Sequence, residues 1–497
     1  MAKKRACRNG CIPASLVNTP AHMEDFMKTS SSTVPSASST SLFGTDGIRG
    51  RANTYPISPE MVLRLGQAVG RYFKSHYPNP RILIGKDTRR SGYFLEQALS
   101  SGICSTGVDT YFVGPLPTPG IAYLTRGMRA NAGIVISASH NPFYDNGFKI
   151  FAADGYKLPD SVEKEIEALI FSNDSSWSFP TGDKIGTTAR IDDSVGQYAV
   201  FLKEQFPKHL SLEGVKIVLD CAHGAAYKVA PKVFEELGAE LIVIGASPDG
   251  TNINQDCGAL HPASLQELVK FHKADIGIAL DGDADRIVVI DENCEIVDGD
   301  ELLAIFAKDY SEKNKLQDNT VVSTIMSNIG LEIALKKMNI KLARTQVGDR
   351  YVVEEMRRGK FSLGGEQSGH LIFGDISTTG DGILAALKLL EIIIEKKTKV
   401  SELKSILHKY PQALKNIDVP ARIPLEKMPE LSKHIHSVQN ILGLEGRVLF
   451  RYSGTELKAR IMIEGNKSHH IHTLIDDLEK TAVQSFDHYF KSIPGRV

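Results

Sequence analysis

The sequence has no long uncharged hydrophobic run and no excess of charge of either sign. Its longest apolar stretch, residues 383–394, contains Lys388 and Glu391. That stretch is too short and too charged to cross a bilayer, so it predicts a buried helix. The 58 lysines and arginines nearly balance the 59 aspartates and glutamates, for a net charge of -1. This balance gives no indication of a nucleic-acid or membrane partner.

Cysteine is scarce, and common signatures of nucleotide binding and ester hydrolysis are missing. No glycine pattern has Walker or dinucleotide spacing, so neither ATP nor NAD is indicated. No G-x-S-x-G elbow is present, which disfavours a serine hydrolase. The cysteines lack metal-ligand spacing and favour a reducing compartment, the cytoplasm, over a disulfide framework. They are Cys7, Cys11, Cys104, Cys221, Cys257 and Cys294.

Residues 1–41 differ in composition from the rest of the chain. They begin with the basic stretch MAKKRACRNG and end in a Ser/Thr-rich stretch, which cannot build a core. We expect a disordered N-terminal extension or a start codon assigned upstream of Met23 or Met27. A basic, Ser-rich, acid-poor leader is also typical of an organellar transit peptide.

From Leu42 onward, short apolar runs alternate with segments of helical periodicity. At 497 residues the chain is too long for one core. The alternation occurs three times, which predicts three similar α/β units with mixed or parallel sheets. Gly238 and Gly359 stand where helix C-caps are expected. The last ~90 residues predict two strands around a loop and then a helix, a smaller α+β unit. The expected domains are 42–185, 186–295, 296–408 and 409–497.

The stretch SASHNPFYDN, residues 137–146, follows the apolar run Ala132–Ile136. The run predicts a buried strand, and Asn141-Pro142 predicts a turn. Ser139 is therefore expected on a loop just past the C-terminal edge of a strand, where open α/β sheets carry their chemistry. It could be a nucleophile, a phosphate ligand, or a residue that stabilises a turn.

The stretch LDGDADRIVVID, residues 280–291, alternates three carboxylates between two apolar runs: Asp281, Asp283 and Asp285. Carboxylates this close repel one another, and a hard divalent cation relieves the repulsion. An EF-hand is disfavoured because Arg286 stands where that loop needs glycine. A haloacid-type phosphatase would need threonine at the same position. Mg²⁺ is preferred, and an exposed acidic turn is the alternative.

Two further loops carry groups suited to a phosphosugar. In RYSGTELKAR, residues 451–460, hydroxyls and backbone N–H groups lie between two arginines, which suits a dianion. In GGEQSGHLIF, residues 364–373, Glu366 and Ser368 suit hydrogen bonds to sugar hydroxyls. A plain hairpin and a tight glycine turn are the alternatives. Together the loops indicate phosphoryl transfer on a phosphosugar without a nucleotide.

These motifs resemble those of the α-D-phosphohexomutase family. SASHNP, DGDADR, GEQSG and RxSGTE occur in the order and spacing of that family's four domains, and the resemblance runs from Leu42 to about Lys491. FGTDGIRGRAN, MSNIGLE (326–332), VGDRYV (347–352) and Gln367 in GGEQSGH are most similar to the branch of bacterial phosphoglucosamine mutases. The resemblance implies four domains around a central cleft.

The resemblance also implies an activity, an isomerase interconverting glucosamine 6-phosphate and glucosamine 1-phosphate for UDP-N-acetylglucosamine and cell-wall precursor synthesis. Ser139 would carry the phosphoryl group as a phosphoserine, and a hexose 1,6-bisphosphate would be intermediate and primer. One Mg²⁺ per subunit would be held by Ser139, Asp281, Asp283 and Asp285. Lys149 is the first candidate for acid/base work, with His140 and Arg49 as polarising groups. The expected substrate-binding residues are Arg286, Glu366, Ser368, Arg451, Ser453, Gly454, Thr455 and Arg460.

Two other functions stay open on the sequence. A phosphomannomutase/phosphoglucomutase would use the same chemistry, and a catalytically dead sugar-phosphate binder would not. Retention of Ser139 and all three aspartates disfavours the binder. The expected partner is a small phosphosugar in the cytoplasm, without nucleic acid or membrane, and the protein is a possible homodimer.

Overall fold

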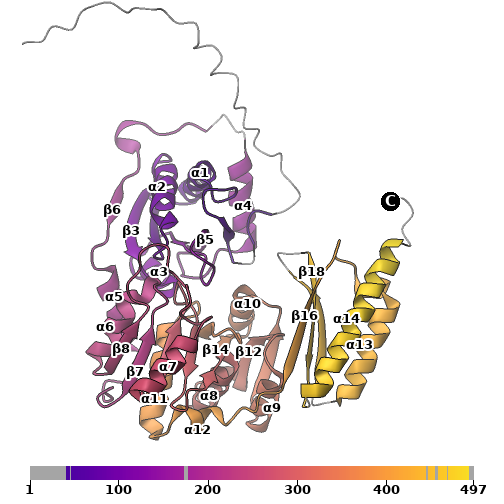
Figure 1. The fold of residues 1–497 in the computed structure, drawn as a ribbon. Helices are drawn as coiled ribbons and strands as arrows, with labels where there is room; N and C mark the ends of the chain where they lie inside the picture. The colour runs from indigo at the N-terminus through magenta and orange to yellow at the C-terminus, as the bar shows by residue number, and fades with distance from the viewer. Residues whose placement is uncertain are drawn as a thin grey trace, which may run out of the picture. The chain divides into compact units, whose positions relative to one another are not determined.

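The structure is a computed structural model (Figure 1). It describes residues 41–44, 46–172, 177–443, 446–453, 457–466 and 468–491. The extension expected at 1–41 lies outside the described residues except for Ser41. Within 42–491 the described strands form four separate sheets, and the first of them includes β6 (Thr188–Arg190), which lies beyond the expected domain boundary at residue 185.

The first unit is a six-stranded mixed sheet in the order β1-β5-β4-β2-β3-β6. Its central strands are parallel, whereas β1 and β5 add antiparallel pairs at one edge. Every residue of β4 is buried, as its unbroken apolar run predicts. The strands are β1 (Ile48–Arg51), β2 (Arg81–Lys86), β3 (Asp109–Pro115), β4 (Ala132–Ile136), β5 (Asp145–Ala152) and β6 (Thr188–Arg190). The helices are α1 (Pro59–His76), α2 (Ser91–Cys104), α3 (Thr118–Gly127) and α4 (Asp160–Phe171).

The second unit is a five-stranded sheet in the order β11-β10-β9-β7-β8. Strands β7, β8 and β9 are parallel, and β10 and β11 are antiparallel. Gly238 follows the helix before β8 with φ +98, which confirms its expected capping position. The strands are β7 (Lys216–Asp220), β8 (Glu240–Ile244), β9 (Ile276–Leu280), β10 (Ile287–Ile290) and β11 (Ile296–Val297). The helices are α5 (Ser194–Glu204), α6 (Val229–Glu236) and α7 (Ala263–His272).

The third unit is a four-stranded sheet in the order β13-β12-β14-β15, with β15 antiparallel. The expected buried helix is confirmed as α11. The capping prediction at Gly359 is wrong: Lys360 adopts the left-handed conformation (φ 52) and ends α10. The strands are β12 (Thr320–Thr324), β13 (Lys341–Thr345), β14 (Leu363–Gly365) and β15 (Leu371–Phe373). The helices are α8 (Gly299–Glu312), α9 (Ile329–Lys337), α10 (Asp349–Gly359), α11 (Gly382–Lys396) and α12 (Val400–Lys404).

The last unit is an antiparallel sheet in the order β16-β18-β17, with two helices on one face (Figure 1). The predicted hairpin and final helix are β17 (Arg447–Tyr452), β18 (Lys458–Glu464) and α14 (Ser468–Lys491). The sequence analysis did not predict β16 (Gln412–Asp418) or α13 (Pro429–Leu442). The buried face of α14 packs its apolar residues into a core with both of these elements.

One feature of the topology repeats in the first three units. In each, a parallel strand is followed by a short loop and an antiparallel partner: β4–β5, β9–β10 and β14–β15. These three loops hold the serine, aspartate and glutamate motifs, so the fold places each motif at the carboxyl end of a parallel strand. Among the described residues, no helix is both long enough and apolar enough to cross a membrane.

Candidate active site

Ser139 lies in the loop between β4 and β5, as predicted, with a buried side chain. Its backbone is left-handed (φ 52), an uncommon conformation for a residue other than glycine. Its hydroxyl donates a 2.6 Å hydrogen bond to Asp281 Oδ2 and lies 3.2 Å from His140 Nδ1. The fold therefore brings this hydroxyl directly to the aspartate loop of the second unit.

Two contacts from outside the loop, one of them fully buried, hold the serine backbone in this conformation. Arg89 Nη2 donates to the Ser139 carbonyl at 3.1 Å, and Asn254 Nδ2 donates to the same oxygen at 2.9 Å. Arg89 is fully buried and ion-paired with Asp87. Ordering by groups from two units supports the unusual φ of Ser139, since local strain persists only where surroundings fix it.

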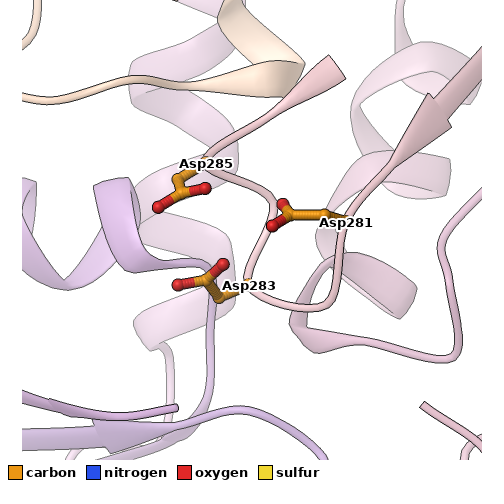
Figure 2. A group of neighbouring side chains, drawn as sticks. All are labelled: Asp281, Asp283 and Asp285. Atoms are coloured by element: carbon orange, nitrogen blue, oxygen red, sulfur yellow. The ribbon is translucent and has the colours of Figure 1, made fainter. Parts of the chain in front are cut away.

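Asp281, Asp283 and Asp285 lie in the β9–β10 loop with all three side chains buried. One carboxylate oxygen from each lies within 4.8 Å of the others, and Figure 2 shows the three groups facing a common centre. Asp283 Oδ2 accepts from Thr118 Oγ1 at 2.6 Å. The Oδ1 atoms of Asp283 and Asp285 are buried and have no hydrogen-bond partner among the described residues.

This geometry fits a hard divalent cation. Burial, together with Asp285 and Asp283, raises the pKa of Asp281 well above its ordinary value. Bound charge of opposite sign would relieve that repulsion, and the two Oδ1 atoms are suitable ligands. The exposed-turn alternative is wrong because the carboxylates are buried. The EF-hand alternative fails too: Glu292, at the twelfth position counted from Asp281, where an EF-hand has its glutamate ligand, instead accepts from the hydroxyl and amide of Ser401.

Lys149 projects from β5 and is buried against the same loop. Its Nζ donates to Asp283 Oδ2 at 2.9 Å and to Asp285 Oδ2 at 3.0 Å, and lies 3.5 Å from Asp46 Oδ2. Burial opposes the charge, but these three carboxylates outweigh it and raise the lysine pKa well above its ordinary value. Lys149 is therefore an ammonium that holds its proton tightly beside these three carboxylates.

His140 and Arg49 complete the surroundings of the serine. Burial, with Arg286 and Arg49 nearby, lowers the pKa of His140 to about 4, so the imidazole is neutral at physiological pH. Arg49, on β1, forms an ion pair with Asp46. Burial opposes the charge of Arg49, but Asp46, Asp283 and Asp285 raise its pKa.

Arg286 connects the aspartate loop with the glutamate loop. Its guanidinium lies 3.7 Å from Asp285 Oδ1 and 3.9 Å from Glu366 Oε2. Glu366 Oε1 accepts from the Gly348 amide at 3.2 Å, and the Ser368 hydroxyl lies 3.4 Å from Glu366 Oε2. Ser368 itself is exposed. Arg286, Glu366 and Ser368 thus form one polar group beside the aspartates.

The predicted phosphate residues form a second group, on the β17–β18 hairpin. Arg451 and Arg460 stand directly opposite each other on the two strands. Burial and the Arg460 charge both lower the pKa of Arg451, and Arg451 Nε is buried with no hydrogen-bond partner in the described part of the chain. Like charges opposed across a sheet are destabilising, and an anion offsets them. Ser453 is buried beside them, whereas Gly454 and Thr455 lie outside the described residues.

Models of one protein family match a part of each of the four units. The models of phosphoglucomutase/phosphomannomutase alpha/beta/alpha domains I, II and III match residues 40–177, 197–295 and 298–410. The model of the C-terminal domain matches residues 414–481. The chain belongs to the phosphoglucomutase/phosphomannomutase family. It is therefore a mutase, an isomerase with the four-domain architecture that the motifs predicted.

Relatives named phosphoglucosamine mutase, a narrower name than that of the family, are similar to this chain over most of its length. A phosphoglucosamine mutase of Pelobacter propionicus is 56% identical over 431 residues, covering 86% of this chain and 95% of the relative. One of Citrifermentans bemidjiense is 54% identical over 443 residues, covering 89% and 98%.

Solved structures of the family show the same fold. A phosphoglucomutase/phosphomannomutase family protein from Burkholderia thailandensis matches with a TM-score of 0.74 and 23% identity, covering 89% of this chain and 97% of that one. An Aspergillus fumigatus N-acetylphosphoglucosamine mutase, solved in complex with GlcNAc-6P and magnesium, matches with a TM-score of 0.61 and 16% identity, covering 89% and 96%.

The mutase site also contains groups that the sequence analysis did not assign. His370 is buried, with Nδ1 3.7 Å from Asp285 Oδ1 and Nε2 accepting from the Gly380 amide at 3.1 Å. Lys157 forms ion pairs with both Asp46 and Asp349. His370 and Asp46 lie within the GGEQSGH and FGTDGIRG motifs and could have been proposed from them. Thr118, Asn254 and Lys157 carry no such signal, because only the tertiary fold brings them here.

Proposed function

We propose that the protein is a phosphoglucosamine mutase that interconverts glucosamine 6-phosphate and glucosamine 1-phosphate. The observation that carries the proposal is the buried hydroxyl of Ser139, bonded to Asp281 at the edge of a carboxylate triad. The narrower substrate class is supported by relatives of that name at 51–56% identity over most of the chain.

In the proposed reaction, Ser139 carries the phosphoryl group and passes it to O1 or O6 of the sugar. The bond between phosphorus and Ser139 Oγ breaks as a bond to the sugar oxygen forms, which gives a hexose 1,6-bisphosphate. That intermediate reorients, and its other phosphoryl group returns to Ser139. Lys149 is the first candidate for proton transfer, and the neutral His140, 3.2 Å from the Ser139 hydroxyl, and Arg49 are the polarising groups.

Ser139, Asp281, Asp283 and Asp285 would hold one Mg²⁺ per subunit. When bound, the cation offsets negative charge on the transferring phosphoryl group. The choice of Mg²⁺ rests on the all-oxygen donor set, and it agrees with the magnesium in the fungal relative's structure. Lys149 bonds the Oδ2 atoms of Asp283 and Asp285 and leaves both Oδ1 atoms available.

The remaining groups divide between the sugar and the distal phosphate. Glu366, Ser368 and Arg286 would bind sugar hydroxyls, since Glu366 Oε2 lies 3.4 Å from the Ser368 hydroxyl and 3.9 Å from the Arg286 guanidinium. Arg451, Ser453, Gly454, Thr455 and Arg460 would bind the phosphate that is not reacting. Two guanidinium groups provide directional, charge-assisted hydrogen bonds for a dianion.

The proposal includes a phosphosugar as partner, a possible homodimer, and action in the cytoplasm. Sedimentation of the purified protein measures the oligomeric state.

A coupled assay that compares glucosamine 6-phosphate, glucose 1-phosphate and mannose 1-phosphate under identical Mg²⁺ and bisphosphate primer tests the function. Turnover of the amino sugar at the highest kcat/KM is expected. Higher kcat/KM with glucose or mannose phosphate would favour a phosphomannomutase/phosphoglucomutase. Binding without turnover of any of the three would indicate a sugar-phosphate binder.

A further inference from the structure

The β17–β18 hairpin carries two charged pairs on one face. Arg451 stands opposite Arg460, and four residues away along the same strands Arg447 stands opposite Glu464. Because side chains alternate between faces with a period of two, both pairs project from the same face of the sheet. At about 3.3 Å per residue, they are roughly 13 Å apart. Between the two pairs of side chains, β17 and β18 are joined by continuous backbone pairing, which couples the two ends of the hairpin.

The Arg447–Glu464 pair contacts the third unit. Glu464 is fully buried, and its Oε2 accepts from Arg447 Nε at 2.6 Å and from the Ile329 amide at 3.2 Å. Arg447 Nη2 donates at 2.5 Å to the carbonyl of Ser327. Arg447 and Glu464 therefore form hydrogen bonds with the residues on either side of Asn328, the N-cap of α9.

The loop before α9 also contacts Tyr410, in the segment that connects the third unit to the last. Asn328 Nδ2 donates at 2.9 Å to the Tyr410 carbonyl, and its Oδ1 accepts from the Tyr410 amide at 3.1 Å. The next residue back, Lys409, bonds Asp298 and Glu301 at 2.9 Å each. The MSNIGLE stretch, which resembles the glucosamine branch, thus contacts the linker and the last sheet.

We infer that Glu464, with Arg447, is a positioning residue: it fixes the angle at which the last domain presents Arg451 and Arg460 to the substrate phosphate. The inference rests on the proposed phosphate-binding role of that pair. Glu464 lies four residues along β18 from Arg460, at the other end of the hairpin from the proposed phosphate site. It holds one end of a stiff hairpin against α9, and any loosening there moves the other end. A binding-competent orientation that is populated only part of the time weakens apparent affinity by that fraction.

The test is Glu464→Gln, which keeps the size of the side chain but removes the charge that pairs with Arg447. We expect KM for the phosphosugar to rise at least five-fold with kcat within two-fold. Hydrogen exchange of the 326–333 peptide, which contains the Ile329 amide, is expected to accelerate. Phosphate on Ser139 and divalent-cation affinity are expected to stay unchanged. Arg447→Lys, which keeps the charge but loses the second donor, gives the same test if the first variant fails to fold.

Glu479→Gln is the matched control, because Glu479 pairs with Lys415 inside the last domain at 2.8 Å. Its KM, kcat and 326–333 exchange are expected within two-fold of the parent. Faster exchange in Glu464→Gln with KM unchanged would overturn the inference, since Glu464 would then be structural only. Unchanged exchange would overturn it as well. If Arg451→Ala leaves KM unchanged, the phosphate-binding role fails instead, whatever the exchange measurement of Glu464→Gln gives.

Discussion

At the scale of single residues, the site is defined by charges that the protein buries without fully pairing. The Oδ1 atoms of Asp283 and Asp285 have no hydrogen-bond partner among the described residues, and Asp281 has a raised pKa. Buried carboxylate oxygens that accept no hydrogen bond cost free energy in the absence of a ligand, and for Asp285 Oδ1 this cost is offset only in part by Arg286 and His370, each 3.7 Å away. Their persistence beside a serine hydroxyl is best explained by a cation and a phosphoryl group that occupy the site during the reaction.

Asp283→Asn is expected to weaken Mg²⁺ binding and to reduce kcat by orders of magnitude, because one anionic ligand becomes neutral. Isothermal titration of the cation and a steady-state assay measure both effects. Asp249→Asn, at an exposed turn of the same domain, is the control and is expected to change neither. Full activity of the chelator-treated parent enzyme without added cation would contradict the metal site.

Ser139→Ala is expected to remove nearly all turnover while the fold and cation binding are retained. The substitution deletes the hydroxyl that bonds Asp281 but opens no core cavity. Intact mass and phosphopeptide mapping of the parent enzyme are expected to find one phosphate, on Ser139. An alanine variant active at the parental rate, with the phosphate on another residue, would show that the carrier is elsewhere.

At the scale of elements, the sequence predicted which strands are followed by loops with functional motifs. It did not predict the direction in which the next strand pairs. The apolar runs of β4 and β9 and the loops after them lie where they were expected, whereas β14 is only Leu-Gly-Gly and has no apolar run to reveal it. An apolar run does not reveal the direction of its pairing, so the antiparallel returns β5 and β15 were not predicted. Nor were β16 and α13. Gly359 was misread because Lys360 supplies the left-handed residue after α10.

Arg451→Ala is expected to raise KM far more than Arg451→Lys, because guanidinium binds phosphate with two directed hydrogen bonds and ammonium acts as a point charge. The loss of Arg451 would cost roughly 2–4 kcal/mol in transition-state binding, as is usual when one partner of a desolvated charge pair is removed. Steady-state kinetics of both variants measure it. Small, equal effects would leave the β17–β18 loop as a plain hairpin.

Asp300, in the first turn of α8, is expected to make stability depend on pH. Burial and the nearby Asp298 raise its pKa from 3.8 to about 7 in the folded protein. The folded state therefore holds this proton more tightly than the unfolded chain, and the stability it contributes is complete below about pH 4. That stability is lost as pH rises towards 7, by up to about 4 kcal/mol.

Asp300→Asn removes this titration. The Tm of the variant relative to the parent is expected to increase from pH 5 to about pH 7 and then level off. Because a chain of four domains need not unfold in one cooperative step, the apparent Tm is compared only between variant and parent at the same pH. A Tm difference that stays constant between pH 5 and pH 8 would show that Asp300 has an ordinary pKa.

At the scale of the whole molecule, two motifs that resemble the glucosamine branch lie at contacts between domains. In VGDRYV, Asp349 pairs with Lys157, and Arg350 pairs with Asp160 and Glu163 of α4. In MSNIGLE, Asn328 holds the linker to the last domain. Such roles cannot be read from a sequence, because each partner lies more than 80 residues away along the chain.

The final prediction concerns the amine at position 2 of the sugar. Glucosamine phosphate is expected to exceed glucose phosphate by at least about ten-fold in kcat/KM, because a charge-assisted hydrogen bond to an ammonium group contributes about 1.5–3 kcal/mol. VGDRYV and MSNIGLE lie at contacts between domains. Gln367, next to Glu366 in the loop proposed to bind the sugar, is therefore the residue we test for the preference. Competitive turnover of both sugars under identical Mg²⁺ and bisphosphate primer measures the ratio. Gln367→Met, which removes the side-chain amide and keeps a side chain of similar length, is the matched variant. A parent enzyme that turns over both sugars equally would place the chain in that other branch, while the phosphoserine chemistry at Ser139 would still stand.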